Sequence, residues 1–333
     1  MKGTKALVKM LERKGVETIF GYPGGSVIPI YDELYDSSLR HVLVRHEQCA
    51  AHMADGYARA SGRPGVCIAT SGPGATNLVT GVATAYADSV PMLALTGQVG
   101  VGSLGLGAFQ EVDAYSLLMP ITKHNFRVLD VKRLPHAVTE AWEICQTGRP
   151  GPVHIDLPVD QMNASVDDET LDAEYHSKPW VEDMSDLEEA VQWIKQAKRP
   201  LILVGGGAIN AADEVMALSR RLNAPVDTTL MGMGVVPSSY GLNMGPLGMH
   251  GRMAALTMMN GADLVISIGS RFSDRTYGKK CRMLDPDGRV VHIDVDSVEF
   301  NKHGHPSANL RCDAAKAVRM ILERLGSGGS SPD

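Results

Sequence analysis

The sequence predicts two α/β domains, each a doubly wound and mainly parallel sheet with helices packed on it. Short apolar runs of strand length alternate with longer segments of helical periodicity along most of the chain. A strand, a crossover helix and a parallel strand form a right-handed unit, so this alternation favours parallel sheets. A chain of 333 residues also exceeds the usual size of one hydrophobic core, which favours two domains.

The first domain is expected at residues 1–165. Its opening segment, MKGTKALVKMLERKG, has the apolar spacing of an amphipathic helix with charges between the apolar positions, unlike a signal peptide. Helical patterns then separate most of the apolar runs that predict strands, so the crossovers can be helical. The predicted strands lie at residues 16–20, 41–44, 65–70, 92–96, 121–128 and 153–156.

An acidic, polar segment at residues 166–185 is interrupted by Pro179 and is expected to be a linker. The second domain is expected at 186–325, and the Gly/Ser-rich residues 326–333 are expected to form a flexible tail. Helices are predicted in the second domain at 187–196, 211–222, 253–259 and 314–325. Strands are predicted at 201–204, 224–228, 264–268 and 290–293.

Composition excludes several classes of function. The formal net charge is −6 and there is no basic stripe, which argues against a nucleic-acid partner. The five cysteines are scattered, without a Cys-x-x-Cys pair or a Cys/His cluster, which favours reduced thiols and argues against structural zinc. No apolar run approaches the length of a membrane span. We therefore expect a cytoplasmic protein.

Three glycine-rich turns of the first domain each follow a predicted strand. They are GYPGG at 21–25, SGPGATN at 71–77 and GQVG at 97–100. In an open α/β sheet such turns lie at the carboxyl ends of the strands, where ligands bind, and glycine lets backbone amides approach a ligand closely. Glycine needed only for tight turns is the alternative for any single loop; three loops at one edge favour a shared site.

Glu47 lies in the segment RHEQCAAHMADGYARASG, after a predicted strand and in the first turn of a helix rich in small residues. A first-turn carboxylate favours the helix dipole by about 0.3–1 kcal/mol, so a helix-start role is the simplest interpretation of an isolated glutamate. Ala50, Ala54 and Ala58 would permit close approach of a second helix. On these alanines we base the expectation that the first domain pairs with its copy in a homodimer.

Several motifs together resemble those of one enzyme family. They are GYPGG (21–25), RHEQ (45–48), HMADGYARASG (52–62), TSGPGATN (70–77), DSVP (88–91), TGQV (96–99), FQE (109–111) and RPGPVHIDLP (149–158). From about residue 2 to about 325 the chain resembles the amino-terminal and central domains of acetohydroxyacid synthase (acetolactate synthase). That family uses thiamine diphosphate to condense pyruvate with a second 2-ketoacid in valine, leucine and isoleucine synthesis. The resemblance implies a pyrimidine-binding domain followed by a Rossmann-like FAD-binding domain.

The resemblance also implies roles for single residues of the first domain. In that family the glutamate matching Glu47 hydrogen-bonds N1′ of the cofactor's aminopyrimidine and assists proton transfer from the thiazolium, which needs a carboxyl group tuned by burial. Other matching residues are Tyr22, Pro23 and Gly24 against the cofactor, Gly25 and Gln98 beside the reacting carbonyl, Phe109 and Gln110 on the substrate side, and Lys123 near the site entrance. For Phe109 a core position, and for Lys123 a solvated charge, are the alternatives.

The second domain matches the flavin-binding part of the family. LILVGGG at 201–207 resembles a dinucleotide turn but lacks a full GxGxxG, and HIDVD at 292–296 ends a strand in carboxylates that suit ribose hydroxyls. Arg275 matches the arginine that receives the second ketoacid's carboxylate, a bidentate role. The implied FAD contacts are Arg149, Gly205, Gly206, Gly207, His250, Gly251, Gly269, Ser270, Arg271, Asp294 and Asp313, with backbone contacts from 229–233.

The chain departs from the family pattern in three places. Ser273 stands where aspartate is usual, and Gly105-Leu-Gly107 replaces a Gly-Thr-Asp type of triplet. The Gly-Asp-Gly segment that holds the diphosphate through Mg²⁺ is not found, and Asp285-Pro-Asp-Gly288 is expected to be only a turn. We therefore expect the third domain to be absent, no metal ligands here, and Mg²⁺ to enter only with a separate carboxyl-terminal chain. A regulatory small subunit is a further possible partner.

Four interpretations of the whole chain stay open at this point. It is part of an acetohydroxyacid synthase, another thiamine-diphosphate carboligase or decarboxylase, a catalytically silent FAD-binding module, or a degraded fragment. Arg275 and Phe109 favour the first over the second, and the presence of Glu47 argues against a silent module. Without the third domain, the chain alone is expected to be inactive.

Overall fold

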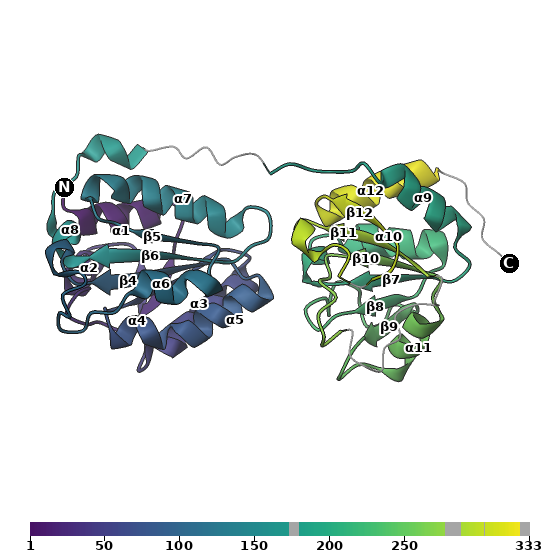
Figure 1. Cartoon of the computed structure of the whole chain (residues 1–333), viewed down its shortest axis with the longest axis horizontal. Coiled ribbons are helices and arrows are strands. Elements are labelled where there is room, and N and C mark those ends of the chain that lie inside the picture. Colours follow the sequence, from purple (N-terminus) through teal and green to yellow (C-terminus); the bar gives the residue numbers. More distant parts are fainter. Residues whose placement is uncertain (173–179, 277–287, 303, 327–333) are drawn as a thin grey trace. The chain divides into compact units, whose positions relative to one another are not determined.

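A computed structural model describes residues 1–172, 180–276, 288–302 and 304–326 of the chain. It divides into two compact units, Met1–Trp180 and Val181–Asp333. Each unit is an α/β fold with one six-stranded sheet, and every strand pairing in both sheets is parallel. The predicted fold class, two doubly wound domains with parallel sheets, is confirmed (Figure 1).

The sheet of the first unit has the strand order β2-β1-β3-β4-β6-β5. The strands are β1 (Thr18–Gly21), β2 (Arg40–Leu43), β3 (Gly65–Ala69), β4 (Met92–Gln98), β5 (His124–Arg127) and β6 (Pro152–Pro158). The helices are α1 (Gly3–Arg13), α2 (Ile28–Tyr35), α3 (Glu47–Ser61), α4 (Pro73–Asn77), α5 (Val79–Asp88), α6 (Ala114–Leu118), α7 (Leu134–Gln146) and α8 (Val159–Asn163). Short 3₁₀ turns are η1 (Val101–Ser103), η2 (Met119–Ile121), η3 (Val131–Arg133) and η4 (Asp168–Asp172).

Helices cover both faces of this sheet. On one face α1, α2 and α7 pack together, and their apolar side chains form one core with alternate residues of the strands. On the other face α3 and α5 form a second core made largely of alanine and small apolar residues (Figure 1). The chain reverses direction across the sheet between β1 and β3, which makes their carboxyl ends the topological switch point.

Helix α3 begins and ends where the sequence predicts. The His46 side chain accepts a hydrogen bond from the Gln48 amide at its start, and Gly62 ends it in the left-handed conformation, with φ 70°. Ala50, Ala54 and Ala58 are completely or almost completely buried, packed against β3 and α5 of the same chain. The proposed use of these alanines as a dimer surface is therefore wrong, because their face is already covered within the chain.

The sheet of the second unit has the strand order β12-β11-β10-β7-β8-β9. The strands are β7 (Pro200–Val204), β8 (Val226–Thr228), β9 (Asn243–Pro246), β10 (Leu264–Ile268), β11 (Arg289–Asp294) and β12 (Ser307–Arg311). The helices are α9 (Leu187–Gln196), α10 (Ala212–Leu222), α11 (Met253–Gly261) and α12 (Ala314–Leu325), with 3₁₀ turns η5 (Gly206–Ala208) and η6 (Ser297–Glu299). Helices α9, α10 and α12 cover one face and α11 the other (Figure 1).

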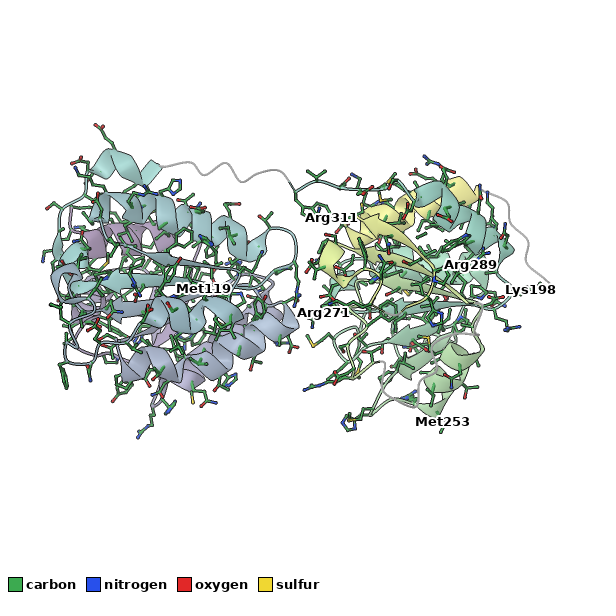
Figure 2. The ribbon with its side chains drawn as sticks, viewed as in Figure 1. Met119, Lys198, Met253, Arg271, Arg289 and Arg311 are labelled. Carbon is green, nitrogen blue, oxygen red and sulfur yellow. The ribbon has the colours of Figure 1, made fainter. Side chains whose placement is uncertain are left out.

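In the second sheet, the side chains labelled in Figure 2 mark the side where the strands begin and the side where they end. Arg289 begins β11 and stacks on the Trp193 ring, with its guanidinium carbon 5.0 Å from the ring centroid. Arg271 and Arg311 lie at the opposite edge, after β10 and at the end of β12 (Figure 2). The switch point of this sheet lies between β7 and β10, on the edge of Arg271.

Some elements differ from the prediction. Strands β9 and β12 were not predicted, because β9 contains glycine and proline and β12, SANLR, alternates buried and half-buried residues at a sheet edge. The strand predicted at 121–128 is shorter, since Met119–Ile121 forms a 3₁₀ turn. The first core extends past residue 165, with Val166 and Leu171 buried in it. The predicted tail from residue 327 on lies outside the described residues.

No helix in the described ranges combines the length and the apolar character that a membrane span would need.

Candidate functional site

The three glycine turns of the first unit meet at its switch point. The Ser26 hydroxyl lies 2.9 Å from the Thr70 hydroxyl and accepts from the Ser71 amide at 3.0 Å, so the first turn is tied to the second. A Cβ on Gly97 would lie 2.2 Å from the Ser26 Oγ, so the third turn packs on the same serine. A Cβ on Gly24 would lie 2.5 Å from the Thr70 Cβ. Because these positions are glycine, the carboxyl ends of the strands β1, β3 and β4 can approach one another.

Glu47 begins α3 beside these turns. Glu47 is only 9% exposed, and its Oε2 accepts a hydrogen bond of 2.9 Å from the side-chain nitrogen (Nδ2) of Asn77, at the end of α4. Its Oε1 lies over Gly74, where an added Cβ would come within 3.4 Å. One carboxylate oxygen is thus held by an amide and the other lies over the glycine turn. A buried carboxylate fixed in this way suits proton transfer or hydrogen bonding to a ligand.

The charge of Glu47 acts on Tyr31, one of a pair of aromatic side chains in the first unit. The Tyr31 and His41 rings form an edge-to-face pair with centroids 4.8 Å apart. Burial, and then the charge of Glu47, raise the pKa of Tyr31, and burial lowers the pKa of His41. Both groups are therefore neutral at pH 7, and the Tyr31 hydroxyl stays a potential donor near the carboxylate.

Gln98 ends β4 and is completely buried. Its Nε2 donates to the Val112 carbonyl at 2.8 Å and to Asp156 Oδ2 at 3.2 Å, and its Oε1 accepts from the Val99 amide at 2.9 Å. The side-chain amide therefore uses both of its polar atoms inside the protein. The predicted role of Gln98 beside a reacting carbonyl stays a prediction, and it requires these bonds to be exchanged.

The loop that carries FQE follows Gln98. Phe109 is 88% exposed, so a core position for it is wrong in this unit. Gln110 has a positive φ of 57°, and its backbone lies against Gly72, where a Cβ would be 2.6 Å from the Gln110 carbonyl oxygen. Glu111 accepts from the amides of Gly105 and Ala108, and these bonds lower its pKa. The loop thus presents Phe109 outward beside the second glycine turn.

Tyr22, Pro23 and Gly25 are exposed in the first turn, and a Cβ on Gly25 would meet nothing within 4 Å. Their backbone is accordingly open to a ligand. Lys123 and Arg149 lie elsewhere, at the amino-terminal edge of the sheet, since the Lys123 amide donates to the carbonyl of Pro152, the first residue of β6. A strand of seven residues places that edge about 20 Å from the turns.

Lys123 and Arg149 both hold backbone in the first unit. Lys123 Nζ donates to the Ile144 and Thr147 carbonyls, at and just after the end of α7, so it is not the solvated charge considered as an alternative. Arg149 donates from Nε to the Ser89 hydroxyl at 2.8 Å and lies over the Tyr86 ring. The site-entrance role of Lys123 and the flavin role of Arg149 stay predictions.

In the second unit, glycines bring together the turns after β7 and β10. A Cβ on Gly205 would lie 2.1 Å from the Gly269 carbonyl oxygen, and one on Gly207 would lie 2.8 Å from the Gly269 Cα. Gly269 has a φ of 58°, and its own Cβ would lie 2.5 Å from Gly207. A Cβ on Gly206 would contact Met231 in the turn after β8. The 205–207, 229–233 and 269–271 segments therefore meet at this switch point.

Polar groups surround this second switch point. The Ser270 hydroxyl is buried and accepts or donates no hydrogen bond within the described part of the chain. Asp294, 8% exposed at the end of β11, accepts from the Asp296 amide at 2.9 Å. Asp313 caps α12 by accepting from the Lys316 amide, so a helix-capping role accounts for it structurally. A buried hydroxyl with no protein partner is a position where a ligand can bond.

His250 and Gly251 follow β9 on the same edge. A Cβ on Gly251 would lie 2.5 Å from the Pro246 carbonyl oxygen, and the Met249 amide donates to the Arg275 carbonyl at 2.9 Å. Arg275 is exposed, on the loop after β10 that also contains Ser273. The flavin and ketoacid residues predicted in this unit therefore share the edge formed by the carboxyl ends of the strands. The turn predicted at Asp285-Pro-Asp-Gly288 lies largely outside the described residues.

Sequence reasoning missed several residues that the structure places at or below these sites. Asn77 holds Glu47, and the signal was present, since it closes the quoted TSGPGATN segment. Asp156 lies in RPGPVHIDLP but was not singled out, although it contacts Gln98. In the second unit Asp227 is completely buried and burial raises its pKa to about 8. Among the described residues, no group of three His, Cys, Asp or Glu side chains is arranged to bind a metal ion.

Two family models match this chain. Residues 1–117 match the model described as thiamine pyrophosphate enzyme, N-terminal TPP binding domain. Residues 187–321 match the model described as thiamine pyrophosphate enzyme, central domain. The two matched ranges fall in the first and second structural units and contain Glu47 and the glycine turns of both switch points.

The chain is also similar to curated proteins over nearly its whole length. It is 48% identical over 333 residues to a probable acetolactate synthase large subunit of Methanocaldococcus jannaschii, covering 98% of this chain and 56% of that protein. It is 46% identical to the acetolactate synthase large subunit of Corynebacterium glutamicum, covering 97% and 52%, and 42% identical to the isozyme 1 large subunit of Escherichia coli, covering 96% and 57%. The chain spans about half the length of the curated relatives it matches.

Proposed function

Because the chain belongs to the thiamine pyrophosphate enzymes, we propose that it is the pyrimidine-side and central part of an acetolactate synthase catalytic subunit. The complete enzyme would condense pyruvate with a second 2-ketoacid with loss of carbon dioxide. These 333 residues would supply the carboxylate for proton transfer and a flavin site, and the diphosphate–Mg²⁺ anchor would come from a carboxyl-terminal part. Reaction type, substrates and partners of the whole protein are all part of this proposal.

The observation that carries the proposal is the placement of Glu47. It lies at the switch point of the first sheet, 9% exposed, with one oxygen bonded to Asn77 and the other over Gly74. A helix-start role alone would not require burial or a side-chain partner on another helix. A glutamate that exchanges a proton with a ring nitrogen requires both, because burial and fixed partners tune its pKa and its orientation.

The residues around Glu47 fit a thiamine diphosphate pyrimidine. The open backbone of Tyr22 to Gly25 would lie against the ring, and Glu47 would bond its nitrogen. Bound thiamine diphosphate supplies the carbanion-stabilising chemistry that decarboxylation of a 2-ketoacid needs. This chain's own groups orient the ring, exclude water and hold a proton at the Glu47 carboxyl. Phe109 and Gln110, on the adjacent loop, would contact the ketoacid.

The second switch point fits a dinucleotide such as FAD. The glycines at 205, 207 and 269 let the turns after β7 and β10 pack on each other, and Gly207 is exposed there. The buried Ser270 hydroxyl has no partner among the described residues, and Asp294 ends β11 as a ribose-binding carboxylate would. The reaction has no required redox step for the flavin. A yellow protein would therefore not indicate an oxidoreductase.

Three further predictions belong to the same proposal. A homodimer, a regulatory small subunit and a cytoplasmic location are expected from the likeness to acetolactate synthase large subunits. The exposed Tyr22, Ile28 and Phe109 leave apolar surface at the Glu47 edge that a neighbouring domain or copy would cover. Light scattering at micromolar concentration tests the dimer, and a monomer would contradict it.

The decisive experiment is complementation. The chain alone, with thiamine diphosphate, Mg²⁺ and pyruvate, is expected to make no acetolactate. Adding the carboxyl-terminal part of a related acetolactate synthase in trans is expected to give acetolactate, detected after acid decarboxylation to acetoin. Acetolactate from the chain alone would contradict the proposed division of the site.

A panel of 2-ketoacids distinguishes the alternatives. Condensation of pyruvate with a second ketoacid supports acetolactate synthase, whereas simple decarboxylation or transfer to another acceptor would indicate a different carboligase. Flavin uptake without any turnover after complementation would indicate a catalytically silent flavin-binding module.

A further inference from the structure

The ends of the loop at residues 99–113 are tied to one buried carboxylate. Asp156, on β6, is completely buried. Its Oδ2 accepts from Gln98 Nε2 at 3.2 Å and from Arg127 Nε at 3.0 Å, and its Oδ1 accepts from the Thr96 hydroxyl at 2.8 Å. Three strands, β4, β5 and β6, therefore converge on this one side chain, which we call the Asp156 hub.

Two side chains, which we call the arms of the Asp156 hub, reach from it to the carboxyl-terminal end of the loop at residues 99–113. Gln98 continues to the Val112 carbonyl at 2.8 Å, and Arg127 continues through its Nη2 to the Asp113 carboxylate. Arg127 also lies over the Tyr115 ring, 5.3 Å from its centroid. Adjacent residues of the loop end are thus held by two different side chains that meet at the same carboxylate.

The entry end of the loop is held as well. The Val99 amide donates to Gln98 Oε1, and the Val101 amide donates to Asp160 at 3.1 Å. Between the two ends, Phe109 is 88% exposed and the Gln110 backbone lies against Gly72 of the second glycine turn. Phe109 and Gln110 therefore lie on a loop whose ends are both held by side-chain hydrogen bonds.

Donor and acceptor roles are defined in the hydrogen bonds that connect His154, Thr96 and Asp156. The Thr96 hydroxyl hydrogen is directed to Asp156, so the Thr96 oxygen accepts from His154 Nε2, 2.7 Å away. Burial lowers the pKa of His154 to about 3, which keeps this ring neutral. Burial raises the pKa of Asp156 although Arg127, Thr96 and Gln98 favour its ionised form. His154 Nδ1 has no hydrogen-bond partner among the described residues, whereas the Thr96 and Gln98 side chains are both bonded to Asp156, which favours one arrangement of these three.

We propose that Asp156 is a positioning residue: through Gln98 and Arg127 it fixes the backbone at Val112 and Asp113, and with it the placement of Phe109 and Gln110 against the 2-ketoacid. The inference rests on the proposed function for its substrate. Gln98 then acts by holding the loop.

Hydrogen exchange of the 333-residue chain tests the loop without any activity. Asp156→Asn is expected to speed amide exchange at residues 104–112 about tenfold. Gln98 and Arg127 then lose the carboxylate that holds both of them, so the loop opens locally more often. Asp113→Asn keeps the oxygen that caps α6 through the Ser116 amide but loses the charge that faces Arg127, and about threefold faster exchange is expected. Asp130→Asn, another capping aspartate, is the matched control and should leave the loop unchanged.

Unchanged loop exchange in Asp113→Asn and in a folded Asp156→Asn overturns the proposal. If Asp156→Asn unfolds the first unit, Asp113→Asn decides alone, since its side chain is exposed and its loss leaves the buried network intact.

Kinetics of the complemented enzyme separate positioning from simple destabilisation. Asp113→Asn is expected to raise KM for the 2-ketoacid about fivefold with kcat changed less than twofold. A fall in kcat at constant KM would overturn the positioning role, because fewer folded molecules lower turnover without changing KM. No acetolactate from the unchanged complemented chain would refute the proposed function instead, and the exchange result would still decide whether the Asp156 hub fixes the loop.

Discussion

The two units share an architecture but differ in what they place at their switch points. Both are six-stranded parallel sheets, and in both, glycine turns bring the carboxyl ends of neighbouring strands together. The first switch point adds a buried, oriented carboxylate, Glu47, and a polar network below it. The second adds mainly backbone, a buried hydroxyl and Asp294.

The first switch point therefore has a group suited to acid–base chemistry, whereas the second has groups suited to binding a ligand. A titratable group held by a partner on another helix can move a proton, whereas open backbone at a glycine turn can only bind and orient a ligand. One fold thus serves both tasks, and the side chain after the strand decides which. The predictions below test whether the two switch points are as different as their residues indicate.

The largest effect is expected from Glu47→Gln in the complemented enzyme. The amide keeps the shape and the hydrogen bond to Asn77, so cofactor binding should change little, yet it cannot exchange a proton. Turnover is expected to fall about 10²-fold to 10⁴-fold, the range for loss of a positioned general acid–base group. Acetolactate formation and thiamine diphosphate affinity are both measured. Turnover at the unmutated rate would show that Glu47 is only a helix-start residue.

The next largest effect is expected from replacing a glycine at the second switch point, which should lower the free energy of unfolding. Gly205→Ala places a Cβ 2.1 Å from the Gly269 carbonyl oxygen, and backbone cannot yield as a side chain can. A loss of about 3 kcal/mol in the free energy of unfolding is expected, the upper end for overpacking. Gly24→Ala, which contacts the Thr70 side chain, should cost less. Urea denaturation followed by circular dichroism gives the values.

Gly261→Ala is the control for these substitutions. Gly261 is the last residue of α11, and a Cβ there would meet nothing within 4 Å, so the change should be neutral or stabilising by up to about 1 kcal/mol. Equal stability of Gly205→Ala and Gly261→Ala would mean that the turns after β7 and β10 separate easily.

Asp227 should make the second unit less stable as pH rises. It lies on β8, completely buried, and neither carboxylate oxygen has a hydrogen-bond partner among the described residues. Burial raises the pKa of Asp227 from 3.8 to about 8, so between these values the folded chain keeps a proton that the unfolded chain has lost. The free energy of unfolding should therefore fall from about pH 4 to about pH 8, by at most about 1.4 kcal/mol per pH unit.

Asp227→Asn should remove this pH dependence, because the amide cannot ionise, and should stabilise the chain at pH 8 by the amount that the unchanged chain loses between pH 4 and pH 8, with no gain below pH 4. Thermal unfolding across this pH range measures it, with the exposed Asp213→Asn as control. A parallel pH profile for both variants would place the source of the dependence outside Asp227.

The smallest effect is expected from Arg149→Ala. Its bond to Ser89 steadies the end of α5, so about 1 kcal/mol of stability should be lost. If Arg149 also contacts flavin, the rise in Tm on adding FAD should shrink. Arg221→Ala is the control, since Arg221 also makes hydrogen bonds at the end of a helix, to the carbonyls of Leu325 and Gly326 at the end of α12. No FAD-dependent rise in the unchanged chain would contradict the flavin site itself.

Local patterns predicted the secondary structure well where burial is continuous. Helices α9 and α12 and strand β10 have the predicted bounds, because their apolar periodicity and flanking residues are unambiguous. The edge strands β9 and β12 escaped prediction because short, partly exposed segments that contain glycine or alternate in burial resemble loops. Strand β9 pairs with β8, and β12 with β11, the strand before it in the chain, but no local signal in either segment encodes that pairing.

The sequence by itself determined the fold class, the glycine turns at the strand ends of both units and the candidate carboxylate, since these depend on periodicity and on motifs within a few residues. Only the tertiary structure showed that the α3 alanines face α5, that Gln98 is committed to Val112 and Asp156, and that Lys123 holds the end of α7. The physical reason is that a hydrogen bond such as Gln98–Asp156, between residues 58 positions apart, depends on which strands are neighbours. Strand order is set by the packing of the whole chain.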